Sequence, residues 1–172
     1  MTLSTYFSQD ADHQRIRWIG DSTVEILLDS ATSDGQLMIL RTDATAGDAA
    51  PVHVHGHEDE VFLVLEGSLT VWVGDARREV GPGGICFLPR GVPHAYRVTS
   101  ATAKVLNICT PGGLEAAFRE AGWNLRDPAP EGWAVTPTAV AEAMGRVSCQ
   151  ILGPPRGADD GPIQVVAAPA AG

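Results

Sequence analysis

The sequence predicts an all-β domain, a small antiparallel β-barrel or sandwich, followed by two short helices. Short apolar runs rich in β-branched residues recur from residue 18 to about residue 110, and turn-forming residues such as glycine and proline separate them. This spacing is typical of all-β barrels and sandwiches. Beyond residue 113 the composition changes to one that favours helices. No internal repeat is visible, so we expect one barrel.

The expected strands follow one another closely along the first two thirds of the chain. They occupy the runs at residues 23–28, 37–41, 61–65, 69–73, 85–88, 95–98 and 104–109. The breaks between them include Gly81-Pro82-Gly83-Gly84, a segment that suits a turn. We therefore assign residues 18–112 to the barrel, and residues 1–17, which are polar and mixed, to an N-terminal arm.

Two helices are predicted after the last strand. Apolar residues at positions i, i+3, i+4 and i+7 form one face of the first helix, namely Leu114, Ala117, Phe118 and Ala121. Gly122 ends this helix. The second begins with Thr136 as the N-cap and Pro137 at the first helical position. Residues 113–152 thus form a C-terminal helical extension, and residues 153–172, rich in Gly, Pro and Ala, form a tail that we expect to be disordered.

The overall charge narrows the classes of partner. The chain of 172 residues carries a formal net charge of -9, whereas binding to nucleic acid or to anionic membranes requires basic patches. No stretch approaches the roughly 18 apolar residues that span a bilayer, and the first residues do not resemble a signal peptide. The three cysteines are odd in number and widely spaced, which favours reduced thiols. We therefore expect a cytoplasmic protein that binds neither nucleic acid nor membrane.

Three histidines and one glutamate are the candidate metal-binding residues of the sequence. His53 and His55 are two residues apart, so on a strand both side chains point to the same face. Glu60 follows just before an apolar run, and His94 follows a Pro-x-Gly turn at the start of another run. Neutral imidazoles with one carboxylate suit divalent transition metals, without selecting strongly among them.

These residues lie in two motifs that closely resemble those of the cupin superfamily. The first motif is met at every position, by Gly47, His53, His55, Glu60 and Gly67. The second is met by Gly83, Pro89, Gly91 and His94, while Val98 stands where the family often has Asn. The resemblance implies a jelly-roll β-barrel. It also implies one divalent transition metal per chain (Fe, Mn, Ni, Co, Cu or Zn), with His53, His55, Glu60 and His94 as ligands.

The period of two along a strand also predicts pocket walls. Phe62 and Val64 share a face with Glu60, and Tyr96 and Val98 share one with His94. We expect these four side chains to contact a small-molecule substrate, although they would equally fill a barrel core. For the other polar residues nearby we expect positions at the surface or in loops. His57 is expected at the pocket rim or surface, His13 in solvent, and Glu58 and Asp59 in a loop at the barrel mouth.

Within the cupins, three features resemble the single-domain quercetin 2,3-dioxygenase-like group. They are the full ligand set, Thr110-Pro111-Gly112-Gly113 before a helix that contains Phe118, and the closing Leu152-Gly153-Pro154-Pro155. The resemblance implies a dioxygenase that opens the ring of a flavonol or a related enolic or aromatic compound with O2. In that reaction Glu60 is both a metal ligand and the catalytic residue that accepts the substrate's hydroxyl proton.

Fold and metal ligands do not determine the reaction, so other functions stay open. One alternative is a non-oxidative biosynthetic cupin, a cyclase, isomerase or decarboxylase that uses the metal as a Lewis acid. Another is a non-catalytic module that carries a metal and binds a small molecule. The resemblance also leads us to expect a homodimer.

Overall fold

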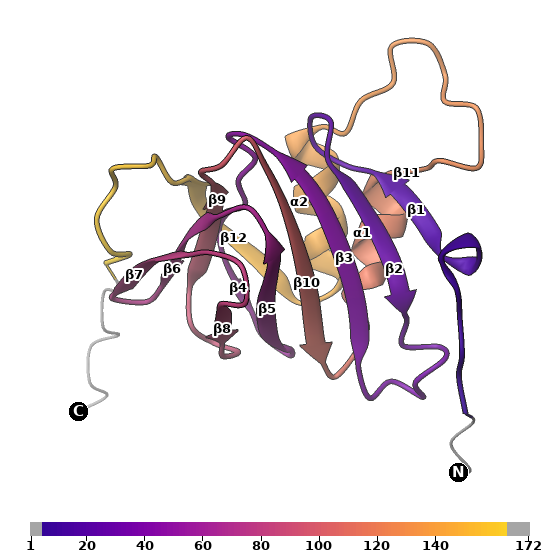
Figure 1. Ribbon diagram of the computed structural model, residues 1–172, viewed down its shortest axis with the longest axis horizontal. Coiled ribbons are helices and arrows are strands. Elements are labelled where there is room, and N and C mark those ends of the chain that lie inside the picture. The colour runs from indigo at the N-terminus through magenta and orange to yellow at the C-terminus, as the bar shows by residue number, and fades with distance from the viewer. Residues whose placement is uncertain (1–4, 165–172) are drawn as a thin grey trace.

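The computed structural model describes residues 5–164 and consists of two antiparallel β-sheets and two helices (Figure 1). One turn of 3-10 helix, Asp10–Asp12, precedes the first strand. The helices are α1 (Glu115–Ala121) and α2 (Pro137–Arg146). The strands are β1 (Gln14–Arg17), β2 (Thr23–Leu28), β3 (Met38–Thr45), β4 (Pro51–His55), β5 (Asp59–Glu66), β6 (Leu69–Val73), β7 (Ala76–Val80), β8 (Ile85–Leu88), β9 (His94–Val98), β10 (Thr102–Thr110), β11 (Trp123–Asn124) and β12 (Cys149–Pro155).

The two sheets face each other as a sandwich. The larger sheet has the order β11-β1-β2-β3-β10-β5-β8, and the smaller has the order β12-β4-β9-β6-β7. Inward side chains alternate along the central strands, as in β3 and β5, where every second residue is buried. This alternation is the physical cause of the two-layer arrangement, since each sheet must cover one apolar face. The predicted all-β jelly-roll fold with two short helices is confirmed.

Two large hydrophobic clusters and a third, small one around Trp72 fill the interior. One lies between the two sheets and includes Phe62, Val64, Leu69, Leu88 and Val98. The other joins the inner face of β1, β2 and β3 to both helices, with buried residues such as Ile16, Leu40, Phe118, Val140 and Ala143. In Figure 1 the helices lie behind this part of the larger sheet. The helices thus cover the half of the larger sheet that the smaller sheet leaves open.

The structure differs from the sequence-based division at both ends of the chain. Gln14–Arg17, at the end of the expected arm, form β1 and pair with β2. At the other end, β12 pairs with β4 and extends past residue 152. Ile163 is buried against Val52 and Trp72, so the part of the expected tail that the structure describes is ordered through residue 164, and residues 165–172 lie outside the described residues. The predicted boundaries between arm, barrel, helical extension and tail stay a prediction.

One position of the first motif, Gly67, accepts only glycine. Gly67 follows β5 with φ of +75°, and a Cβ added there would lie 2.1 Å from the carbonyl oxygen of Thr102. Only glycine combines this conformation with so close an approach of two backbone segments. Among residues 5–164, no helix is long and apolar enough to cross a membrane.

Candidate metal centre

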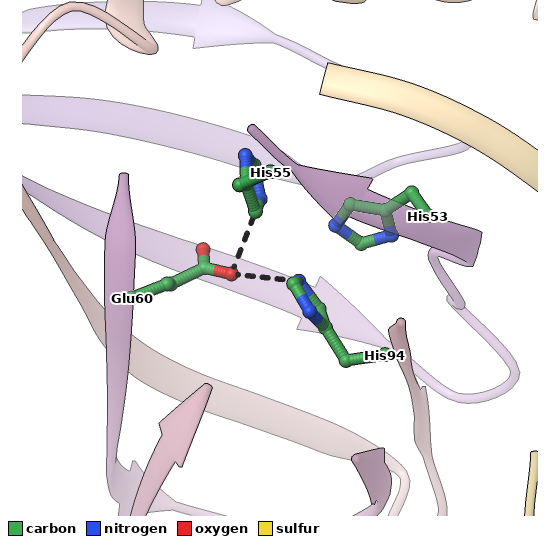
Figure 2. A group of neighbouring side chains, drawn as sticks. All are labelled: His53, His55, Glu60 and His94. Carbon is green, nitrogen blue, oxygen red and sulfur yellow. Dashed lines mark ion pairs between the residues drawn. The ribbon is translucent and has the colours of Figure 1, made fainter. Parts of the chain in front are cut away.

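Three neighbouring strands bring the four predicted ligands together. β4 carries His53 and His55, β5 carries Glu60, and His94 is the first residue of β9. His53 and His94 face each other across the β4–β9 pair. Figure 2 shows all four side chains pointing toward one another, as the period of two along β4 requires. The site therefore spans both sheets, since β5 belongs to the larger one.

The distances from the Glu60 carboxylate to two imidazoles fit those around a single ion. Glu60 Oε2 lies 3.3 Å from His94 Nε2 and 3.5 Å from His55 Nε2. One ligand atom from each of the four residues can be chosen so that all lie within 4.8 Å of one another. Two atoms that each lie about 2.1 Å from one ion are at most about 4.2 Å apart, so both carboxylate–imidazole distances fall inside that limit.

Hydrogen bonds on the far side of two rings orient the histidines. His53 Nδ1 lies 2.8 Å from the carbonyl oxygen of Pro51, and His94 Nδ1 lies 2.9 Å from that of Val92. A carbonyl oxygen only accepts, so in each case Nδ1 carries the hydrogen and donates it. The lone pair of a neutral ring is then on Nε2, which is the arrangement found in metal-binding histidines.

Several polar atoms at this point are buried without a partner. Among the described residues, His55 Nε2, His94 Nε2 and Glu60 Oε2 make no hydrogen bond, and all three are inaccessible to solvent. Buried polar atoms without a partner are rare, because each costs about 1–3 kcal/mol. Three of them converging on one point fit a cation, so the chain has a cluster that can hold a metal ion.

Two groups of the cluster, His53 and Glu60, are shifted toward the forms that bind metal. Burial and the nearby His94 lower the pKa of His53 to about 3, so this imidazole is neutral at physiological pH. Burial alone would raise the pKa of Glu60, but the imidazoles of His55 and His94 outweigh it and hold that pKa well below its usual range. A neutral imidazole beside an ionised carboxylate is the state in which both groups bind metal. Burial would lower the pKa of His55, but Cys149 and Glu60 outweigh it and raise this pKa to about 10, so a metal ion has to displace the proton of His55.

Sequence reasoning missed one neighbour of the cluster. Glu58 was expected in a loop at the barrel mouth, but it is buried, and its Oε2 lies 3.7 Å from His55 Nδ1. The spacing of three residues from His55 was the available signal. The prediction for His57 is consistent with its exposed position. Asp59 is the first residue of β5 and forms an ion pair with Arg90 at 2.8 Å.

An apolar pocket adjoins the cluster, with about 720 Å³ of empty volume including the part open to solvent. His53, His55 and Glu60 form part of its wall. Of the four predicted substrate contacts, Phe62 and Tyr96 line this pocket and pack edge to face at 5.6 Å. Val64 and Val98 do not line it and are buried in the core between the sheets. The pocket wall is completed by residues from the first strands and both helices, among them Trp18, Leu114, Phe118, Val140 and Met144.

A second group of possible ligands does not form a comparable site. Asp10, His13 and Glu25 lie close together, but Arg15 Nε lies 3.0 Å from Glu25 Oε1, and Arg41 Nη2 also contacts this carboxylate. The two guanidinium groups already neutralise the glutamate. His13, expected in solvent, instead packs against Glu25 with an Nδ1–Oε1 distance of 3.3 Å.

Comparison with known proteins agrees with the fold and the cluster. Residues 40–109 match the family model of the cupin domain, and this range includes all four ligands. The chain therefore contains a cupin domain. Over 103 residues it is 30% identical to quercetin 2,3-dioxygenase from Bacillus subtilis (strain 168). The aligned region covers 60% of this chain and only 31% of that protein.

Solved structures show the same architecture. KdgF from a Halomonas species matches with a TM-score of 0.58 and 17% sequence identity, covering 64% of this chain and 96% of that one. An RmlC-like cupin from Shewanella frigidimarina matches with a TM-score of 0.54 and 23% identity, covering 65% and 96%. At these identities the likeness shows the fold alone.

Proposed function

We propose that this protein is a metal-dependent dioxygenase that opens the ring of a flavonol or of a related enolic or aromatic small molecule. The observation that carries the proposal is the cluster of three imidazoles and one carboxylate beside an apolar pocket. The partial similarity to quercetin 2,3-dioxygenase supports the choice of reaction.

His53, His55, Glu60 and His94 would hold one divalent transition metal, which when bound supplies positive charge and open coordination positions. The residues beside it have separate tasks. Glu60 directs Oε2 at two histidines, which leaves Oε1 to accept the proton of an incoming hydroxyl. Phe62, Phe118 and the other apolar side chains of the wall bind a flat ring and exclude water.

The test is oxygen uptake by protein loaded separately with Fe(II), Mn(II), Ni(II), Co(II) or Cu(II), with quercetin as substrate. We expect uptake that needs both metal and quercetin. If protein with confirmed metal content consumes no oxygen with any of the five, the dioxygenase proposal is wrong. Product formed without oxygen would then indicate Lewis-acid chemistry, and binding without any product would indicate a binding module.

The role of Glu60 has its own test. The change Glu60→Gln keeps an oxygen that can bind metal but removes the proton acceptor, so turnover should fall by about 10²-fold or more. Metal content, measured by elemental analysis of the purified protein, should remain substantial. Full turnover in this variant would contradict the proton-transfer role.

We also propose that the protein forms a homodimer through the outer face of the larger sheet. On β8, Ile85 and Phe87 are 70% and 59% exposed, and Leu65 on the neighbouring strand is 38% exposed. Val61 and Leu63 are the β5 residues opposite Phe87 and Ile85. These five residues form a contiguous apolar surface, which is unusual on a monomer.

The charges around this surface favour a second copy of the chain. The ion pairs Asp59–Arg90 and Glu66–Lys104, both at 2.8 Å, border it. They leave its rim electrically balanced although the whole chain carries a net charge of -9. Sedimentation velocity should show a dimer that Phe87→Glu dissociates. A monomeric wild-type protein, or a dimer unaffected by this change, would contradict the proposal.

A further inference from the structure

Three polar side chains face the interior of the barrel without partners. Thr42, Tyr96 and Asn107 line the main pocket and also a second, smaller pocket. Among the described residues, their side-chain polar atoms make no hydrogen bond, and Asn107 Oδ1 is inaccessible to solvent. A buried amide oxygen without a donor costs about 1–3 kcal/mol, which indicates that a partner is supplied from the pocket.

The strand register places this polar group close to the metal cluster. On β10, Cys109 lies opposite Glu60 of β5, and Asn107 lies opposite Phe62. Cys109 is the β10 residue level with Glu60, and Asn107, two residues before it, is the next β10 residue that points inward. Successive inward residues on a strand are about 7 Å apart. A ligand whose hydroxyl approaches Glu60 therefore brings more distant atoms near Asn107.

The charges of the pocket specify what kind of atom fits there. No lysine or arginine is among the described residues that line the pocket. Tyr96 and Thr42 contribute hydroxyl groups, which donate and accept hydrogen bonds, and Asn107 contributes an amide that does both. The three side chains offer donors and acceptors but no positive charge. A second anionic group of a ligand at this end of the pocket would have no lysine or arginine as a counter-ion.

We propose that Asn107, with the hydroxyl groups of Tyr96 and Thr42, binds a second, uncharged hydroxyl of the substrate, remote from the hydroxyl that reaches Glu60. The inference rests on the proposed function to the extent that an enolic or phenolic substrate occupies this pocket. The substrate class is then a flat aromatic compound that carries a further neutral hydroxyl, and dicarboxylates and other doubly anionic compounds are excluded. Asn107 acts as a specificity-determining residue.

The experiment compares two flavonols that differ in their remote hydroxyl groups. Quercetin has hydroxyls on both outer rings, whereas 3-hydroxyflavone has none there. Dissociation constants are measured without oxygen, so that no turnover occurs, from the quenching of tryptophan fluorescence in metal-loaded protein. Trp18 lines the pocket and reports on occupancy. Wild-type protein should bind quercetin more tightly than 3-hydroxyflavone.

The variant Asn107→Leu removes the amide with little change in volume. It should weaken quercetin binding about tenfold, the effect of one buried hydrogen bond, and leave 3-hydroxyflavone within about twofold of wild type. Asn124→Leu, on β11 and outside the pocket lining, is the matched control and should change neither constant. If circular dichroism shows that Asn107→Leu is unfolded, Asn107→Ala takes its place with the same expected pattern.

Two results would overturn the inference. One is unchanged quercetin binding in the Asn107 variant, and the other is an equal loss for both flavonols, which would indicate a general effect on the pocket. The oxygen-uptake test is separate, because selective binding of quercetin through Asn107 can be present in protein that consumes no oxygen. Failure of the dioxygenase proposal and failure of this inference are therefore distinguishable.

Discussion

The buried carboxylate of Glu58 leads to a prediction with opposite effects on metal affinity and on the stability of the metal-free protein. Its side chain is 4% exposed, and its Oε2 is 3.7 Å from Nδ1 of His55. Neither of these two atoms has a hydrogen-bond partner among the described residues. When Nε2 of His55 binds metal, Nδ1 carries the hydrogen, and Glu58 is the acceptor beside it.

The size of the effect on metal binding follows from this position. Removing a carboxylate that supports a metal-binding histidine typically lowers metal affinity about 10- to 100-fold, which corresponds to about 1.4–2.7 kcal/mol. We expect Glu58→Gln to fall in this range. In the metal-free protein, burial raises the pKa of Glu58, and its Oε2 makes no hydrogen bond although His55 Nδ1 is 3.7 Å away. The same change relieves the cost of burying this carboxylate, so the melting temperature should rise.

The assay is a competition titration with a chromophoric chelator, combined with thermal melts with and without metal. Asp59→Asn is the matched control, because it removes the same charge from the next residue, whose carboxylate contacts Arg90 instead of the cluster. Its metal affinity should stay within about twofold of wild type. The reasoning is refuted if Glu58→Gln retains full affinity, or if both variants lose affinity equally, since the latter would reflect only the overall charge.

Three further predictions concern the ligand set, the pH dependence of stability and the core. His94→Ala should lower metal content strongly in elemental analysis, whereas His57→Ala, at an exposed position, should not. Burial opposes ionisation of Asp29, but the hydrogen bonds from Arg119 and Thr32 together outweigh it and lower the pKa below 3.8. This residue therefore stabilises the fold above that pH, and the contribution is lost as the pH falls through the lowered pKa. Calorimetry should therefore show that Asp29→Asn lowers the melting temperature near pH 6 and that the difference shrinks in acid; a constant difference would contradict this. Phe118→Ala should cost about 3–5 kcal/mol in urea unfolding, because it empties the space between α1 and the sheet, and a loss below about 1 kcal/mol would show that the core closes around the gap.

Local patterns in the sequence were sufficient to predict several strands and the four residues of the possible metal cluster. The predicted runs at 23–28, 69–73 and 85–88 coincide with β2, β6 and β8. Alternation has a fixed period along a strand, so it also placed His53 and His55 on one face. The motif spacings predicted that Glu60 and His94 join these two histidines, and the structure places all four in one cluster.

Strands without an apolar alternation were missed. β7 lies at the edge of the smaller sheet, and its residues are exposed or half-buried. β12 contains glycine and prolines, which the sequence analysis assigned to the end of the helical extension and to a tail. Proline is tolerated there because β12 is also an edge strand, and its pairing with β4 is irregular.

The sequence alone thus determined the all-β class, the four residues of the possible metal cluster and the face on which Phe62 and Tyr96 lie, because each depends on spacing within one strand or one motif. Only the tertiary structure decided that Glu58 is buried behind His55, that Asn107 faces the pocket two residues from the β10 residue opposite Glu60, and that α1 and α2 close one half of the larger sheet. These features depend on which strands pair and in which register. Contacts between residues far apart in the chain set that register, and no local pattern specifies it.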